Sequence, residues 1–107
     1  MQYKIRARTL HHGTYAKLVK EYKAVSCWTI TNHCAIKLDE REFAYEDLFR
    51  VIDEGEFTEY HTMKDTRRAI VKQDDLCVVL DLDDKAIITI FTSNELGQKD
   101  NQLFGGI

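Results

Sequence analysis

The first residues of the chain alternate between apolar and polar side chains. Across residues 2 to 8, Tyr3, Ile5 and Ala7 fall on one face and three cations fall on the other. A period of two predicts a half-buried β-strand, and here its outer surface is cationic. The pattern ends at the His-His-Gly sequence that follows.

Apolar residues at helical spacing predict three helices after this strand. The first begins at Thr14, which we expect to be its N-cap. Its apolar stripe comprises Tyr15, Leu18, Val19 and Tyr22. The capping pair Thr31-Asn32 then opens a second helix over about residues 33–41, and a third helix follows over about residues 45–54.

Gly55 stands where a left-handed C-cap of the third helix is expected, and β-prone segments follow it. Strands are predicted over about residues 56–60, 67–72, 76–82 and 85–92. Turns at residues 73–75 and 83–84 join the last three of them, because aspartate is a preferred turn residue. Sequential strands with such tight connections predict an antiparallel meander of three or four strands.

Together these elements predict an α+β fold. It comprises an N-terminal strand and helix, a helical pair, and an antiparallel three- to four-stranded meander. The chain has 107 residues, which suits one domain spanning 1–107. The most regular unit covers about residues 28–93, and the polar tail over about 94–107 is expected to be loose.

The composition is typical of a globular protein, with 44% apolar residues and no proline. Met1 is not followed by the apolar segment of a signal peptide, and no window approaches the roughly 20 apolar residues that cross a bilayer. The three cysteines (Cys27, Cys34 and Cys77) show no CxxC spacing. We therefore expect a cytoplasmic protein with free thiols and no membrane attachment.

Charge is distributed unevenly along the chain. Residues 1–37 hold seven basic side chains and one acidic side chain, a net charge of +6. Residues 38–107 hold eight basic and seventeen acidic side chains, a net charge of −9. A basic first third is suited to a phosphate backbone or an acidic partner. The alternative is internal complementarity, with the basic part packed beside the acidic remainder.

Three basic side chains recur at four-residue spacing on the second predicted helix. His33, Lys37 and Arg41 lie about 40° apart on a helical wheel and so form a narrow cationic ridge beside the core face. From the sheet, Arg68 near the start of one strand and Thr92 at the end of the last are the candidates to meet this ridge.

Such a set of side chains has the chemistry to act on an RNA phosphodiester. A neutral histidine exchanges a proton with the ribose 2′-hydroxyl or the leaving oxygen. Lysine and arginine stabilise the charge on the phosphorane, and a threonine hydroxyl orients an oxygen. The reaction needs no metal and no cofactor, and the histidines and cysteines form no zinc motif. The competing interpretation is that the ridge is a solvated helix face.

The order of motifs over about residues 31–93 resembles a family of small bacterial and phage domains of unknown function. The residues that carry the resemblance are His33-x-x-x-Lys37-x-x-x-Arg41-x-Phe43, Tyr45-Glu46-Asp47-Leu48, Val51-Ile52-x-x-Gly55-Glu56, Arg68-Ala69-Ile70-Val71, Val78-Val79 and Ile87-Ile88-Thr89-Ile90-Phe91. That family is similar in turn to the barnase, EndoU, colicin and RelE group of metal-independent ribonuclease toxins. The resemblance implies a role for His33, Lys37, Arg41, Arg68 and either Thr89 or Thr92.

Two hypotheses about function follow. In the first, a RelE- or barnase-like domain binds RNA and cleaves it through His33, with Lys37, Arg41, Arg68 and Thr92 holding phosphate; its partner is RNA or an antitoxin. In the second, a non-enzymatic phage or bacterial protein binds a host protein through its acidic surface. The candidate residues of that surface are Asp74, Asp75, Asp83 and Asp84. The sequence does not indicate the oligomeric state.

Overall fold

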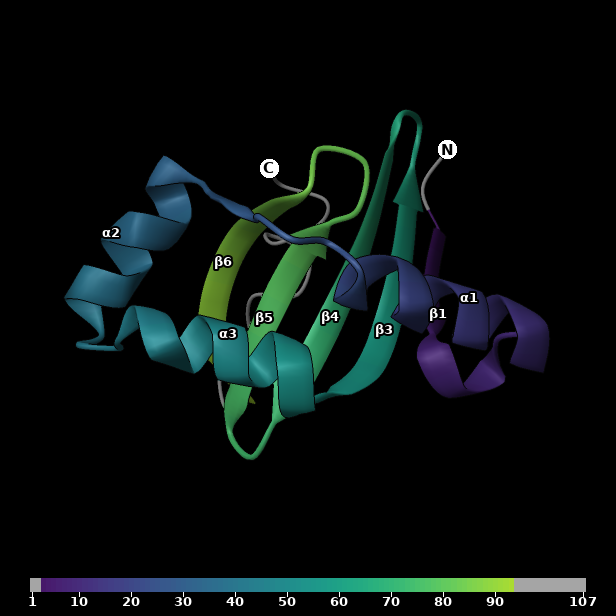
Figure 1. Cartoon of the computed structure of the whole chain (residues 1–107), viewed down its shortest axis with the longest axis horizontal. Helices are drawn as coiled ribbons and strands as arrows, with labels where there is room; N and C mark the ends of the chain where they lie inside the picture. The colour runs from purple at the N-terminus through teal and green to yellow at the C-terminus, as the bar shows by residue number, and fades with distance from the viewer. Residues whose placement is uncertain (1–2, 94–107) are drawn as a thin grey trace.

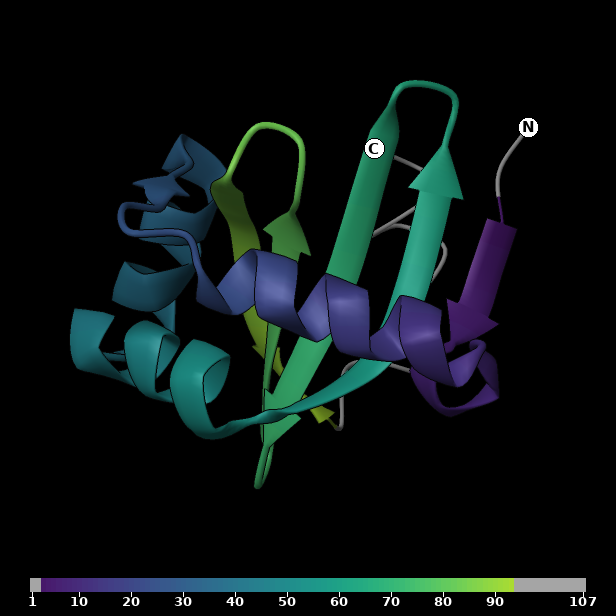
Figure 2. The ribbon, with the colours of Figure 1, turned by 45° about the vertical axis from the view of Figure 1, so that its right-hand side comes forward.

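The structure, a computed structural model, describes residues 3–93 and has an α+β fold, as predicted. Its sheet has the strand order β1-β3-β4-β5-β6-β2. These strands are β1 (Tyr3–Arg6), β3 (Glu56–Met63), β4 (Thr66–Gln73), β5 (Leu76–Asp81), β6 (Ala86–Thr92) and β2 (Thr29–Ile30). The helices are α1 (His12–Lys23), α2 (Asn32–Glu40) and α3 (Tyr45–Glu54). Helices α1 and α3 cross one face of the sheet, and α2 lies beside β6 (Figures 1 and 2).

The predicted antiparallel meander forms the centre of this sheet. Strands β3 to β6 pair antiparallel in sequence order, while β1 adds to β3 at one edge and β2 adds parallel to β6 at the other. Each edge strand joins a neighbour that is distant in the sequence, so no local pattern announces the pairing. The N-terminal strand therefore belongs to the same sheet as the unit over 28–93. In the described part of the chain, no helix is long and apolar enough to span a membrane.

The first strand and the first helix differ from their predicted bounds. The strand ends at Arg6, and the 3-10 turn η1 (Ala7–Thr9) follows it. Helix α1 begins before Thr14, because the ring of His11 acts as its N-cap: Nδ1 accepts a hydrogen bond from the Gly13 N–H at 3.1 Å. The predicted Thr14 cap is therefore wrong. Histidine is outside the usual set of N-cap residues, so the sequence pattern favoured threonine.

The main core fills the space between the helices and the sheet. Helix α1 contributes the buried Leu18 and Tyr22, and the Tyr22 ring packs in a T-shaped arrangement with Phe57 on β3, with ring centroids 6.1 Å apart. Burying one such side chain stabilises a fold by about 1.5–3 kcal/mol. A smaller buried cluster lies on the opposite face of the sheet; it comprises Ile70, Cys77, Val79 and Phe91.

Arg67 at the start of β4 joins α1 to the turn between β5 and β6. Its guanidinium donates to both carboxylate oxygens of Glu21, at 2.7 and 3.1 Å, and its Nε donates to Asp83 at 3.0 Å. Paired, planar contacts of this kind are the strong form of an ion pair. Hydrogen bonds from Arg67 lower the pKa of Asp83, and those to Glu21 and Asp83 raise the pKa of Arg67.

Gly55 ends α3 without the predicted left-handed conformation. Its φ and ψ are −76° and 172°, which is extended backbone that any residue adopts. Glycine is required for a different reason: a Cβ at this position would lie 2.4 Å from the Val51 carbonyl oxygen and 2.9 Å from that of Lys72. The absent side chain thus lets the end of α3 approach β4 closely.

We expect Gly55→Ala to lower the free energy of unfolding by about 1–3 kcal/mol, because the new methyl group overlaps fixed backbone atoms. Urea denaturation measures this change. Gly13→Ala is the matched control, since a Cβ there meets only the His11 ring, at 3.4 Å. It should be neutral or stabilise the protein by up to ~1 kcal/mol. Equal destabilisation in both variants would contradict the explanation.

Candidate functional site

Helix α2 is fastened along the outer edge of β6 by residues at its two ends. At its start, the Thr31 hydroxyl accepts from the Cys34 N–H at 3.1 Å and lies 2.9 Å from the Ile87 carbonyl oxygen, to which it can donate. At its end, the Arg41 guanidinium donates to the Ile90 carbonyl oxygen at 3.2 Å. The Ile87 carbonyl also accepts the Thr31 backbone N–H at 3.2 Å, whereas the Arg41 contact satisfies a carbonyl group beyond the two residues of β2.

Of the predicted cationic ridge, His33 and Lys37 lie on α2, whereas Arg41 follows the helix as its C-cap, with a φ of −101° and a ψ of 2°. His33 is exposed, whereas Lys37 and Arg41 are half-buried. The Lys37 ammonium is 3.4 Å from a carboxylate oxygen of Glu40, and Arg41 is engaged with β6. Two of the three side chains therefore already have partners within the fold.

The structure does not bring Arg68 to the ridge. Arg68 shares the sheet face of Ile70, opposite the helices, and its cross-strand neighbour on β5 is Asp81. Thr92 pairs with Leu76, at the other end of β5, on the helix-bearing face. At a rise of ~3.3 Å per residue the two ends of β5 are roughly 17 Å apart.

The two threonines named by the resemblance also differ in position. Thr92 belongs to β6, the strand that Arg41 contacts, and it is half-buried. Thr89 is buried and pairs with Val79, on the sheet face away from the helices. The helix-bearing face thus holds His33, Lys37, Arg41 and Thr92, while Arg68 and Thr89 lie on the other.

A row of polar side chains crosses the face of the sheet opposite the helices. Lys4, His61, Arg68 and Asp81 are successive cross-strand neighbours on β1, β3, β4 and β5. His61 is only 3% exposed, and the Asp81 carboxylate accepts the N–H groups of Asp83 and Asp84. Burial of His61 keeps a substrate away from its ring.

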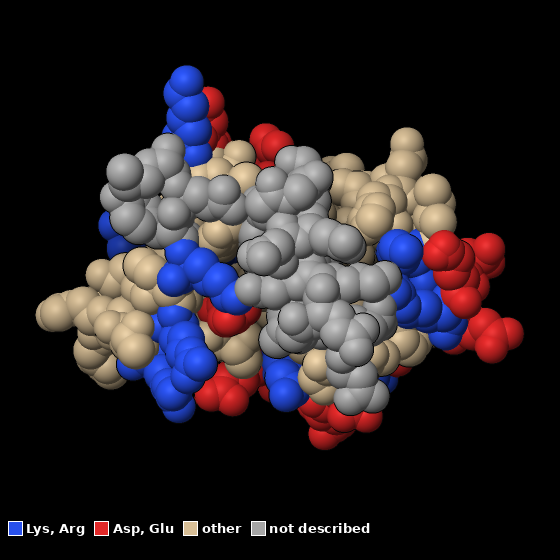
Figure 3. Space-filling view, turned by 180° about the vertical axis from the view of Figure 1, so that it is seen from behind, with Lys and Arg blue, Asp and Glu red and all other residues tan. Residues whose placement is uncertain are grey.

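Five exposed cations lie on consecutive elements, and motif spacing did not reveal them. We call them together the basic surface, which extends over two faces: Arg6 on β1 and Arg8 on η1 line a groove with Cys77 on the sheet face away from the helices, whereas Lys17, Lys20 and Lys23 lie on α1. Within residues 3–93, none of the five side chains has an ion-pair or hydrogen-bond partner. From behind, Lys and Arg side chains are visible on the β1 side of the sheet, with some acidic side chains beside them (Figure 3). The only sequence signal was the charge of +6 over residues 1–37.

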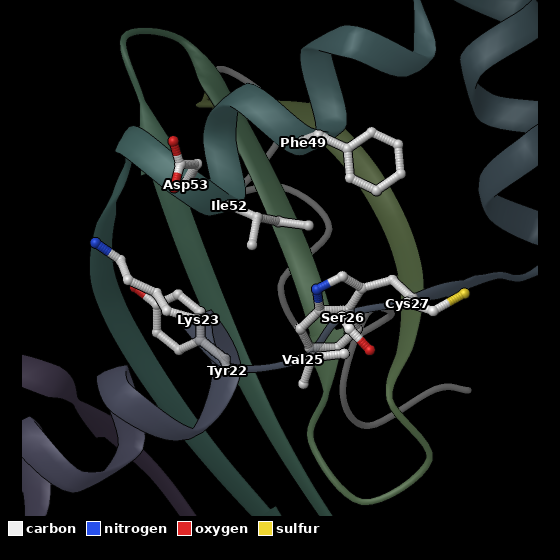
Figure 4. Close-up of a pocket in the computed structure, with 9 residues that line it drawn as sticks. Tyr22, Lys23, Val25, Ser26, Cys27, Phe49, Ile52 and Asp53 are labelled. Atoms are coloured by element: carbon white, nitrogen blue, oxygen red, sulfur yellow. The ribbon is translucent and has the colours of Figure 1, made fainter.

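A groove of about 350 Å³ lies between α3 and the segment that leaves α1. Its lining residues are Tyr22, Lys23, Val25, Ser26, Cys27, Trp28, Phe49, Ile52 and Asp53. Phe49, Ile52 and Asp53 project from α3, and Tyr22, Lys23 and Val25 lie on the other side (Figure 4). The sequence placed Tyr22 in the apolar stripe of the first helix and did not reveal the groove, because segments on two different elements meet to form it.

The four aspartates of the second hypothesis do not share one surface. Asp74 and Asp75 turn the chain between β4 and β5, and Asp83 and Asp84 turn it at the opposite end of β5. Asp74 has a φ of 55°, which suits a turn, and Asp83 is occupied by Arg67.

The thiols offer little reactivity in the interior. Burial raises the pKa of Cys34 and of Cys77 to about 11, so both stay protonated near neutral pH. Cys27 is exposed and lines the groove. Within the described range, 3–93, no group of three or more His, Cys, Asp and Glu side chains could hold a metal ion.

Comparisons with known proteins leave the relationship open: no protein-family model, curated protein or solved structure matches the chain. The resemblance to the barnase and RelE group therefore stays a prediction.

We expect Thr31→Ala to lower the free energy of unfolding by about 1–2 kcal/mol, because it removes the N-cap of α2. The variant also lacks the hydroxyl that reaches β6. Thr14→Ala is the control: Thr14 is exposed inside α1 and caps nothing, so its effect should stay within ~0.5 kcal/mol. Chemical denaturation compares the two, and a Thr14 variant that is as unstable as the Thr31 variant would refute the assigned cap.

Proposed function

We propose that the protein is an RNA-binding domain that contacts the phosphate backbone through its basic surface. The observation that carries this proposal is that all five cations of that surface are exposed and have no ion-pair partner among the described residues. Cations of this kind bind polyanions by releasing counterions from the phosphates. The preference for RNA over other polyanions is supported by the resemblance of residues 31–93 to ribonuclease-like domains.

The proposal is for binding without cleavage. Arg68 lies on the far face of the sheet, Lys37 contacts Glu40, and Arg41 contacts a backbone carbonyl. His33 is exposed, so it is accessible, but Arg68 is on the other face of the sheet, and Lys37 and Arg41 have partners within the fold. An antitoxin partner belongs to the cleavage hypothesis and is not part of this proposal. Free thiols and RNA as a ligand suit a cytoplasmic location, which we propose with the function.

We expect Lys17→Glu/Lys20→Glu to weaken binding of a labelled single-stranded RNA at least tenfold. The slope of log affinity against log salt concentration should become less negative by roughly 0.7 for each phosphate that the protein no longer neutralises. Fluorescence anisotropy over a range of salt concentrations measures both effects.

The matched control is Lys64→Glu/Lys85→Glu, which makes the same change in net charge at exposed lysines of two β-turns. The control should keep most of the affinity. Equal weakening in the two double variants would mean that only net charge matters and would contradict a local basic surface.

The absence of cleavage is tested separately with excess protein and RNA in EDTA. The RNA should remain intact with the wild-type protein and with His33→Ala. Fragments ending in 2′,3′-cyclic phosphate that form with the wild type and disappear with His33→Ala would establish cleavage. That result would refute binding alone while leaving the basic surface as the RNA contact.

A further inference from the structure

We propose that the groove between α3 and the end of α1 receives one unstacked base of the bound RNA, with preference for bases that carry an exocyclic amino group. This inference rests on the proposed function, because it assigns a base-binding site to the same RNA.

The basic surface leads directly to the groove. Lys17, Lys20 and Lys23 follow one another at three-residue spacing on the outer face of α1, and all are exposed. Lys23, in the last turn of the helix, is also part of the groove lining. A phosphate chain that follows these lysines therefore arrives at the groove, where its next base is within reach.

The walls of the groove are suited to a flat ring. Phe49 is 45% exposed, which is unusual for a large apolar side chain, and the half-buried Trp28 belongs to the same lining. Bases of single-stranded RNA stack on such aromatic side chains. A volume of about 350 Å³ is at the small end for ligand sites, which suits a single nucleotide.

Asp53 supplies the selectivity. Its carboxylate is exposed at the groove and, among the described residues, has no hydrogen-bond or ion-pair partner. An ionised carboxylate only accepts hydrogen bonds, so it favours the amino groups of adenine, cytosine and guanine. Uracil has no amino group, and the carbonyl oxygens beside its single N–H repel the carboxylate.

The charges of the groove favour a nucleotide over a purely apolar partner segment. Lys23 offers a cation for the phosphate, and Asp53 offers an acceptor for the base edge. The apolar lining beside them matches the two faces of the ring. A nucleotide satisfies all three features at once.

The experiment uses Trp28, the only tryptophan of the chain, as the reporter. Titrating the full-length protein with AMP and with UMP should quench Trp28 emission, with AMP binding several-fold more tightly. Phe49→Ala should weaken AMP binding about tenfold, the effect expected for one base–aromatic stack. Tyr45→Ala is the matched control, because Tyr45 is similarly exposed one turn earlier and does not line the groove.

The preference for amino-bearing bases is tested with Asp53→Asn, which should bring the affinities for AMP and UMP together. Glu46→Gln, on the same helix and outside the groove, should preserve the difference.

Each outcome separates this inference from the proposed function. RNA binding through α1 with no response of Trp28 to AMP would overturn the base site and keep the RNA-binding function. Quenching by AMP without any RNA binding would keep the base site and overturn that function. Emission that changes with protein concentration alone would show that a second copy covers the groove, and would overturn the inference.

Discussion

The contact of Arg67 with Glu21 and Asp83 determines how charge is presented on this molecule. Glu21 is the only acidic residue among the first 37, and it is bound by an arginine from β4. The remaining cations of α1 are therefore left without the one acid that could pair with them on their own helix. The same contact, with the burial of Leu18 and Tyr22, fixes α1 across the sheet. The Arg67–Glu21 contact thus both holds α1 in place on the sheet and leaves the lysines of α1 without an acidic neighbour on the helix.

Local periodicity predicted much of the fold, and pairings between distant segments account for most of the rest. The meander and α3 follow from strand alternation, turn residues and one strong apolar stripe. The two edge strands depend on partners far along the chain, and β2 is too short to show a pattern. The N-cap at His11 was not predicted because a histidine ring nitrogen, rather than a hydroxyl or carboxylate oxygen, accepts the hydrogen bond. Gly55 is needed because the backbone of β4 approaches the end of α3, and that approach is not visible in the sequence.

The sequence could predict the relative positions of candidate residues within one helix, but not the positions of residues that belong to different elements. Four-residue spacing placed His33 and Lys37 one turn apart on α2, but the helix ends before Arg41, which is its C-cap. Whether Arg67 or Arg68 faces the helices depends on the register of β4, because neighbouring strand residues point to opposite faces. In the observed register, Arg67 faces the helices and Arg68 faces the opposite side of the sheet. Arg41 likewise has a role in the fold, since it completes the edge of β6.

In the part of the chain that the structure describes, the sheet has two edge strands, β1 and the two-residue β2, and the outer side of β1 is the longer open edge. An open edge is a template on which further chains can add as strands. Here the edge is four residues long and bears Lys4 and Arg6. Two copies that met edge to edge would bring like charges together over a short ladder. Arg6, which we assign to ligand binding, thus also opposes growth of the sheet from one molecule to the next.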